Sequence, residues 1–233
     1  MCTGRADLAF ILRAFSKGAD GVYIGGCWLG ECRYITEGNY DALGLVHLTR
    51  KIMKQVGISP DRLRIEWTSA SEGIRFADIM NDFAKKLRQL GPIGKAEGLS
   101  DDGLKFKLEA ITNLIPYIKL VERERLRVRF ESEKEYEEFF RGEEVARLFK
   151  DLIVDKLALS QIMALLRDQP RSAVDISGVL SLSASEVSTH LNTLARQGLI
   201  TFDESRNLIA VAYSEADARG VPAGQGQRLC CPA

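Results

Sequence analysis

Long hydrophobic runs are absent from this chain of 233 residues. No apolar stretch approaches the ~18–20 residues that a membrane-spanning helix needs, and the first residues do not have the pattern of a signal peptide. The formal net charge is zero, so overall charge gives no reason to expect nucleic acid or an anionic membrane as a partner. The chain contains five cysteines. We therefore expect a cytoplasmic protein that binds no membrane. In the cytoplasm disulfides are rare, so clustered cysteines more often bind metal or do redox work.

Charge is unevenly distributed along the chain. Residues 1–99 hold 14 basic and 11 acidic side chains, residues 100–155 hold 11 and 14, and residues 156–233 hold 7 of each. The hydrophobic fraction of 45% and the charged fraction of 27% are typical of a globular protein. Together with the local patterns, this predicts four parts: an α/β domain (1–95), a charged helical connector (96–155), a winged helix–turn–helix-like domain (156–213) and a disordered tail (214–233).

Helices and strands alternate in the first part. Apolar residues at helical spacing predict helices over about 6–17, 39–56 and 72–90, and β-forming residues predict strands at Gly21–Gly25 and Leu63–Trp67. Such alternation is typical of a parallel sheet covered by helices. The predicted fold class is therefore α/β, with a small open parallel sheet flanked by helices. Two strands alone would leave both sheet edges open and bury little surface, so we expect this domain to lack its first strand.

The strongest chemical signal follows the first predicted strand. Gly25-Gly26 ends that strand, Cys27 comes next, and Cys32 follows five positions later. Ligands of an open parallel sheet collect at the carboxyl ends of its strands, and glycine lets the backbone turn sharply there. A third cysteine, Cys2, lies just before the first predicted helix, whose dipole favours a thiolate. We predict that Cys2, Cys27 and Cys32 are metal ligands at this edge, with sulfurs within roughly 4–7 Å of one another.

A purely structural role is the alternative for these cysteines. A free cysteine is most often a small buried hydrophobe. Two cysteines five positions apart also carry less weight than a pair of C-x-x-C motifs. Cys230 and Cys231 are adjacent and close to the end of the sequence, and we interpret them as incidental.

The later part of the chain changes character twice. Residues 99–156 carry dense charges on helical patterns, which we interpret as a solvated helical face. From Leu157 onward the pattern predicts helix, helix, turn, helix and β-hairpin, and Ser183 with Glu186 forms a capping box at the start of the third helix. This order resembles a winged helix–turn–helix domain of the small bacterial and archaeal regulators.

The first 92 residues resemble a known family. The motifs that carry the resemblance are Met-Cys-Thr-Gly-Arg-Ala-Asp (1–7), Gly-Ala-Asp-Gly-Val-Tyr-Ile-Gly-Gly-Cys (18–27), Gly-Glu-Cys-Arg-Tyr (30–34), Glu-Gly-Asn-Tyr (37–40), Arg64–Trp67, Ser69–Phe76 and Leu90–Pro92. They are similar to those of the iron–sulfur delta subunit of methyl-viologen-reducing hydrogenase. The resemblance implies a non-catalytic electron-transfer subunit of anaerobic metabolism that carries a [2Fe–2S] cluster. Its implied partners are a hydrogenase or formate dehydrogenase-type enzyme and a flavin-containing heterodisulfide-reductase-like subunit.

The chain departs from the family pattern in two places. Family members begin with a further strand and a cysteine-rich turn, and they tend to have His after each loop cysteine, where this sequence has Trp28 and Arg33. A protein-held [2Fe–2S] centre usually takes four thiolates, so three cysteines are one ligand short. We therefore expect that Met1 is not the natural start of the protein and that an upstream segment supplies both the missing strand and the missing ligand.

A redox-sensing transcription regulator is the second hypothesis. Its expected recognition helix offers side chains that could reach base edges, namely Ser185, Ser188, Thr189, His190 and Asn192. DNA binding, however, depends largely on Lys and Arg at the phosphates, and residues 183–197 contain a single base, Arg196. We therefore expect that DNA is not a partner and that this domain serves protein docking or dimerisation.

Overall fold

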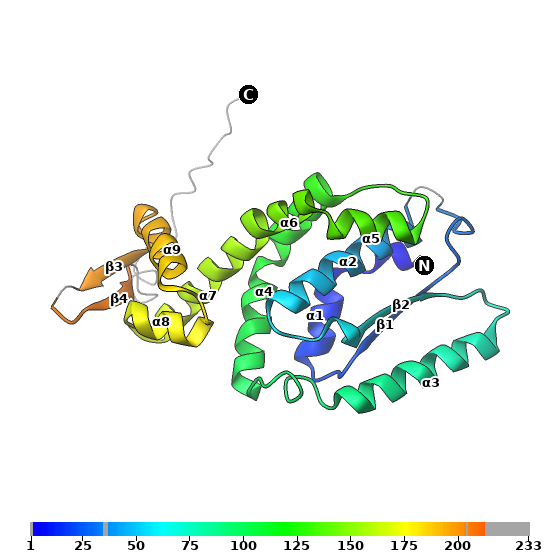
Figure 1. Cartoon of the computed structure of the whole chain (residues 1–233), viewed down its shortest axis with the longest axis horizontal. Coiled ribbons are helices and arrows are strands. Elements are labelled where there is room, and N and C mark those ends of the chain that lie inside the picture. Colours follow the sequence, from blue (N-terminus) through cyan, green and yellow to red (C-terminus); the bar gives the residue numbers. More distant parts are fainter. Residues whose placement is uncertain (1, 35–36, 204, 213–233) are drawn as a thin grey trace, which may run out of the picture. The chain divides into compact units, whose positions relative to one another are not determined.

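The computed structural model describes residues 2–34, 37–203 and 205–212. The chain divides after Ser160 into two compact units, which are described separately below (Figure 1). The predicted disordered tail (214–233), with Cys230 and Cys231, lies outside the described residues. No helix in the described part of the chain combines the length and the apolar character needed to cross a lipid bilayer.

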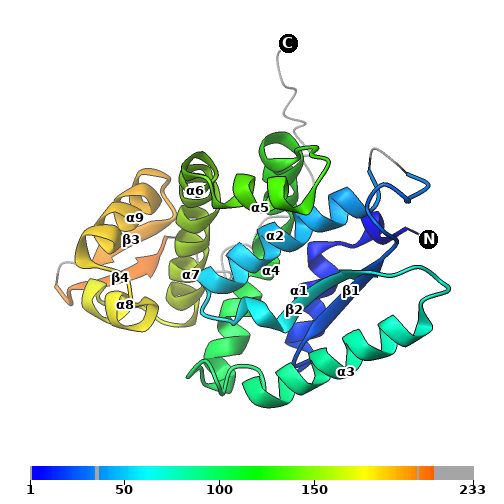
Figure 2. The same ribbon diagram turned by 45° about the vertical axis from the view of Figure 1, so that its right-hand side comes forward.

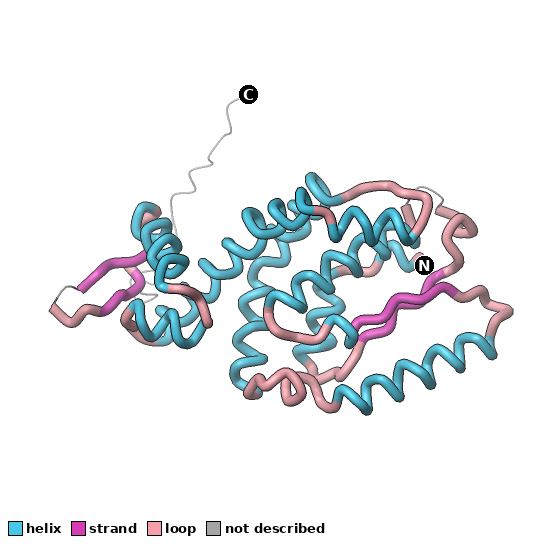
Figure 3. Tube along the Cα trace, viewed as in Figure 1, coloured by secondary structure: helices cyan, strands magenta, loops and turns pink. Residues whose placement is uncertain are grey.

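The N-terminal unit contains a two-stranded parallel sheet. Strand β1 (Val22–Gly26) pairs with β2 (Leu63–Trp67), in a register that places Val22 opposite Leu63 and Gly26 opposite Trp67 (Figure 3). The elements before and between the strands are the 3₁₀ turn η1 (Thr3–Arg5) and the helices α1 (Leu8–Ser16) and α2 (Asn39–Gln55), with a second 3₁₀ turn, η2 (Pro60–Arg62), before β2. Helix α3 (Gly73–Leu90) follows β2. The predicted α/β class and its small parallel sheet are confirmed.

The two faces of this sheet differ in polarity. Ile24, Leu63 and Trp67 are buried in a core shared with α1 and α2, whereas α3 runs along the other side of the sheet (Figures 1 and 2). On the α3 side, the Arg64 guanidinium lies 2.6 Å from the Asp82 carboxylate. This alternation is expected for strands with one strongly apolar face, because successive side chains point to opposite sides.

The segment predicted as a connector folds against the same core. It forms α4 (Asp101–Val121), a turn of π-helix (Glu122–Leu126), α5 (Glu133–Arg141), α6 (Glu143–Phe149) and a second π-helical turn (Lys150–Val154). Ile111, Tyr136 and Phe149 are buried in the core cluster that also holds the side chains of α1 and α2. Residue 95 therefore does not separate compact units. The helices are charged outside and apolar inside, so the interpretation as a solvated face describes only their outer side.

The capping-box pattern of Ser69 and Glu72, before α3, is only half formed. The sequence places Ser69 at the start of a capping box for α3, but the residue before the helix is Glu72 and it makes no capping bond from its side chain. The Glu72 carboxylate instead accepts hydrogen bonds from the Ser69 backbone N–H, at 2.6 Å, and from the Trp28 indole N–H, at 2.8 Å. The Glu72 carboxylate thus makes its half of the capping-box pattern and also holds Trp28.

A fully buried arginine joins several segments of this unit. Arg62 is 0% exposed, and its Nε lies 2.6 Å from Glu97 Oε1. Its Nη1 donates to the carbonyls of Asp20 and Gly91, and its Nη2 donates to the carbonyls of Leu90 and Pro92 and to Glu97 Oε2. Burial alone raises the pKa of Glu97, but its hydrogen bonds and charge contact with Arg62 outweigh burial and lower that pKa below its usual value. The site is a satisfied buried ion pair.

Arg62→Ala is expected to lower the free energy of unfolding of the N-terminal unit by about 3–5 kcal/mol, because it leaves the Glu97 carboxylate buried without its partner. Trp28 and Trp67 are the two tryptophans of the chain, and both lie in this unit, so tryptophan fluorescence during urea unfolding reports on it. The matched control is Lys86→Ala, which removes an exposed ion pair with Asp61 and should change stability little. Equal stability losses in the two variants would contradict this account.

The C-terminal unit forms a small helical domain with a hairpin. Helix α7 (Asp155–Asp168) leads into it, followed by α8 (Ala173–Leu180), α9 (Ala184–Arg196), β3 (Ile200–Asp203) and β4 (Leu208–Val211). The strands are antiparallel, and Arg171 adds a bridge to Ile209. The predicted capping box at Ser183 and Glu186 is present. The element order confirms the predicted winged-helix arrangement.

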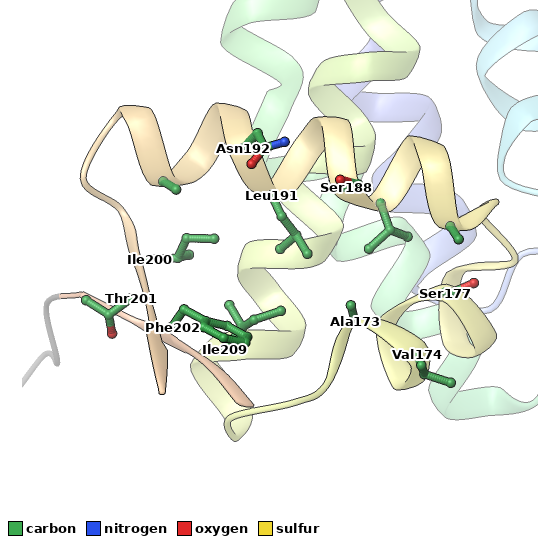
Figure 4. A pocket seen from close by; sticks show the side chains of 13 residues that line it. Ala173, Val174, Ser177, Ser188, Leu191, Asn192, Ile200, Thr201, Phe202 and Ile209 are labelled. Carbon is green, nitrogen blue, oxygen red and sulfur yellow. The ribbon is translucent and has the colours of Figure 1, made fainter. Parts of the chain in front are cut away.

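An apolar hollow of about 500 Å³ lies between α8, α9 and the hairpin (Figure 4). Leu191, Ile200, Phe202 and Ile209 contribute apolar side chains to it, and none of its 13 lining residues is charged. His190, one of the side chains that could reach base edges under the regulator hypothesis, is buried at 9% exposure. Its place on the inner face of α9 follows from the helical repeat, because Val187 and Leu194 lie on the same face and are also buried.

Candidate metal centre

The three predicted cysteines lie at the carboxyl end of β1. Cys27 directly follows the last residue of this strand, Cys32 lies in the loop that continues to α2, and Cys2 precedes the η1 turn. The Sγ atoms of Cys2 and Cys32 are 3.6 Å apart. Cys32 is buried at 4% exposure, and Cys2 and Cys27 are partly exposed. Cys2 does not precede α1 directly as predicted, since Asp7 caps that helix and the η1 turn intervenes.

A contact between two glycines brings Cys2 to Cys32. A Cβ atom on Gly4 would lie 2.4 Å from the Gly38 carbonyl oxygen, so the two backbones meet with no room for a side chain. Gly38 has a positive φ of 56° at the start of α2, and a Cβ there would lie 2.4 Å from Cys32 Sγ and 3.3 Å from Cys2 Sγ. Glycine is required at both positions, because any larger residue would push the η1 turn away from the loop.

Asn39, the first residue of α2, holds the cysteine loop. Its side chain is fully buried, and Nδ2 donates to the carbonyls of Cys27 and Trp28, each at 2.8 Å. The same nitrogen lies 4.0 Å from Cys27 Sγ. Asn39 therefore fixes the loop backbone next to the thiol of Cys27.

Trp28 secures the loop from the other side. Its indole N–H donates to Glu72 at the start of α3, and the Arg75 guanidinium lies over its ring, 4.8 Å from the centroid. The indole thus docks the cysteine loop onto α3. The loop is held between the first turns of two helices.

The protonation of the loop thiols differs. Burial raises the pKa of the Cys27 thiol, and its contact with Cys32 raises it further. Burial also acts to raise the pKa of Cys32, but hydrogen bonds from the backbone N–H groups of Tyr34 and Asn39 and from the thiols of Cys2 and Cys27 outweigh it and lower that pKa. As the pH rises, Cys32 therefore loses its proton before Cys27 does.

The three thiols are the right type of ligand for an iron–sulfur cluster, but they are one fewer than a [2Fe–2S] centre usually takes. Thiolates are the usual ligands of iron–sulfur clusters, and a [2Fe–2S] centre usually takes four. Three thiols are present here, and no group of three His, Cys, Asp or Glu side chains in the described residues is arranged around a single metal-ion position. Reasoning from the sequence missed Gly4, Gly38 and Asn39 as parts of the site. All three fall within the Met-Cys-Thr-Gly and Glu-Gly-Asn-Tyr motifs, so membership of these motifs could have identified them as residues of the site.

The N-terminal residues are similar to a known protein family. Residues 1–91 match the family model of the methyl-viologen-reducing hydrogenase delta subunit. A relative from Methanocaldococcus jannaschii, the iron–sulfur subunit of an F420-non-reducing hydrogenase, is 38% identical over 91 residues, which are 39% of this chain and 67% of the relative. The chain belongs to the hydrogenase delta-subunit family. The predicted family is thereby confirmed.

Two further relatives contain the same family segment. The iron–sulfur subunit of an F420-non-reducing hydrogenase from Archaeoglobus profundus is 50% identical over 91 residues, 39% of this chain and 66% of the relative. One of the subunits of the CoB-CoM heterodisulfide reductase of Methanosarcina mazei is 45% identical over 94 residues, 40% of this chain and 12% of that protein. The chain thus spans less than two thirds of either relative. Its residues 160–201 match a different family model, that of bacterial regulatory proteins of the arsR family.

Asn39→Ala is expected to lower the free energy of unfolding of the N-terminal unit by about 2 kcal/mol, because it leaves the carbonyls of Cys27 and Trp28 without their donor. Urea unfolding followed by tryptophan fluorescence measures this change. Asn81→Ala, at an exposed position on α3, is the control and should leave stability nearly unchanged. An unchanged midpoint in the Asn39 variant would show that the loop is held by other contacts.

Proposed function

We propose that this protein is an electron-transfer subunit that carries a [2Fe–2S] cluster. Cys2, Cys27 and Cys32 serve as three of its ligands, and the fourth donor comes from outside this set. When bound, such a cluster accepts and donates one electron at a time. The chain's own residues provide the thiolates, fix the loop through Asn39 and Trp28, and bury Cys32 away from solvent.

The single observation that supports this function best is the meeting of Cys2 and Cys32. Their sulfurs come together, at 3.6 Å, only because two glycines far apart in the sequence are in contact. A pair of structural cysteines would not need such a costly backbone arrangement, whereas ligands of one centre must converge. Membership of a family whose relatives are named iron–sulfur subunits agrees with this interpretation.

The same relatives support, in general terms, a partner enzyme of the hydrogenase or heterodisulfide reductase kind. Family members are subunits of hydrogenases, and the segment also occurs within a much longer heterodisulfide reductase protein. We propose that this chain passes electrons between a hydrogenase or formate dehydrogenase-type enzyme and a flavin-containing heterodisulfide-reductase-like subunit, and that it has no substrate chemistry of its own. Isolation of the native complex would identify both partners.

Anaerobic reconstitution of the full chain with ferrous iron, sulfide and an excess of a small thiol, which supplies the fourth thiolate, is expected to give about two iron atoms per chain and, after one-electron reduction, the paramagnetic signal of a [2Fe–2S] centre. Cys27→Ser and Cys32→Ser should each lose most of this iron, because a hydroxyl is a much poorer iron ligand than a thiolate. Iron analysis and electron paramagnetic resonance measure both effects.

The double variant Cys230→Ser/Cys231→Ser is the matched control for this experiment. It removes two thiols that have no part in the proposed centre and should keep the iron content of the parent chain. A parent chain that takes up no iron would contradict the proposal. Full iron content in both loop-cysteine variants would contradict the ligand assignment.

A redox-sensing transcription regulator is a second candidate, favoured by the arsR-family match over residues 160–201. The charge of the C-terminal unit opposes it. Residues 161–212 contain four arginines and no lysine against five acidic residues, and α9 carries a single base, Arg196. The exposed part of this helix consists largely of small polar side chains such as Ser185, Ser188 and Asn192. Few phosphates could be neutralised by such a surface.

The full chain is expected not to bind duplex DNA of its own promoter specifically at physiological salt, because so few bases are available for phosphate contacts. Electrophoretic mobility shift across a salt series, with an unrelated duplex of equal length as control, measures this. Tight binding to the promoter alone, with an affinity that falls steeply with salt, would overturn the expectation and favour the regulator.

A further inference from the structure

The sulfurs of Cys2 and Cys32 are close enough to react with each other. They lie 3.6 Å apart, and a disulfide bond measures about 2.05 Å, so an approach of about 1.5 Å would join them. The two residues belong to different segments, the start of the η1 turn and the loop after β1, and neither lies inside a helix or strand. Small shifts of these two segments can therefore supply the approach without breaking the sheet.

Cys2 is accessible to small molecules from solvent, whereas Cys32 is buried. Cys2 lines an open cavity of about 270 Å³ together with Gly4, Arg5, Tyr34 and Gly38, whereas Cys32 is 4% exposed. A small molecule can reach Cys2 first and Cys32 only afterwards. No side chain stands between the sulfurs, because the residue beside both of them is Gly38.

We propose that the chain without its cluster closes a reversible disulfide between Cys2 and Cys32, with a low-molecular-weight disulfide as the oxidant. Cys2 attacks one sulfur of the oxidant, forming a mixed disulfide and releasing the first small thiol. Cys32 then attacks the Cys2 sulfur, which forms the Cys2–Cys32 bond and releases the second small thiol. The two cysteines lose two electrons and two protons in total, and the oxidant takes them up as two thiols.

This disulfide does not depend on the proposed function, since it requires no iron. It does exclude cluster binding, because both sulfurs are used in the covalent bond and a disulfide sulfur is not a thiolate ligand. The cluster-free chain thus has a closed, oxidised state and an open, reduced state, and only the reduced state can accept a cluster. Cys27 stays a free thiol in both.

Peptide mapping tests the proposal on the full chain. The iron-free protein is equilibrated with oxidised glutathione, its remaining thiols are blocked, and it is digested with trypsin and then cleaved after glutamate. Trypsin releases residues 1–5 and 18–33, and cleavage after Glu31 separates Cys27 from Cys32. The expected product is residues 1–5 linked to residues 32–33, with Cys27 blocked by the thiol reagent and the link lost on reduction.

Two glycine variants test the geometry. Gly38→Ala places a methyl group against both sulfurs and is expected to slow formation of the Cys2–Cys32 link by up to about a hundredfold, because a misplacement near 1 Å has a cost of this order for reacting groups. Gly30→Ala is the matched control. Gly30 also has a positive φ, of 84°, but nothing lies within 4 Å of an added Cβ, so this variant should react at nearly the rate of the parent.

The mapping of the parent chain decides the matter even if the Gly38 variant does not fold. A link between residues 18–31 and residues 32–33, which joins Cys27 to Cys32, would overturn the proposal. So would full blocking of both Cys2 and Cys32 after the same oxidation. Either result leaves iron binding untouched, so failure here is distinguishable from failure of the proposed electron-transfer function.

Discussion

The buried guanidinium of Arg62 is the interaction on which the N-terminal unit depends. It lies just before β2, and it bonds to the carbonyl of Asp20 just before β1 and to carbonyls at the end of α3. The amino ends of both strands are therefore tied to one charged group, and Glu97 neutralises it. A two-stranded sheet has few ladder hydrogen bonds of its own, so a polar anchor of this kind replaces what additional strands would supply. The carboxyl ends of the strands are left free for chemistry.

At the carboxyl ends of the strands, a contact between two backbone segments sets the positions of the cysteines. Gly4 and Gly38 are in contact, and this contact brings the turn that begins at Cys2 against the loop that holds Cys32. Asn39 and Trp28 then fix the rest of the loop through hydrogen bonds to its carbonyls and to Glu72. The thiols are thus positioned from three sides, by a helix start, a short turn and α3. Such external support is what keeps ligands in place in a centre built on a loop.

The closeness of Cys2 and Cys32 supports both proposed roles, metal ligand and disulfide partner, and these roles exclude each other. Because Cys32 is buried, a small oxidant would reach Cys2 before Cys32. Residues 161–203 and 205–212 of the C-terminal unit contain no cysteine. Its helices, hairpin and uncharged apolar hollow form a winged-helix arrangement whose sequence carries little of the basic charge on which nucleic-acid binding depends.

The sequence by itself determined the secondary structure, the parallel pairing of β1 and β2, the winged-helix order and the family, because periodicity, glycine–proline stops and motif order are local properties of the chain. It also singled out Cys2, Cys27 and Cys32 as candidates. Only the tertiary structure decided that α4–α6 share the core of the sheet and that the Glu72 carboxylate accepts a hydrogen bond from the Trp28 indole. It also decided that Gly4 touches Gly38 and that Arg62 is buried. Each of these depends on contacts between segments distant in the sequence, which no local pattern records.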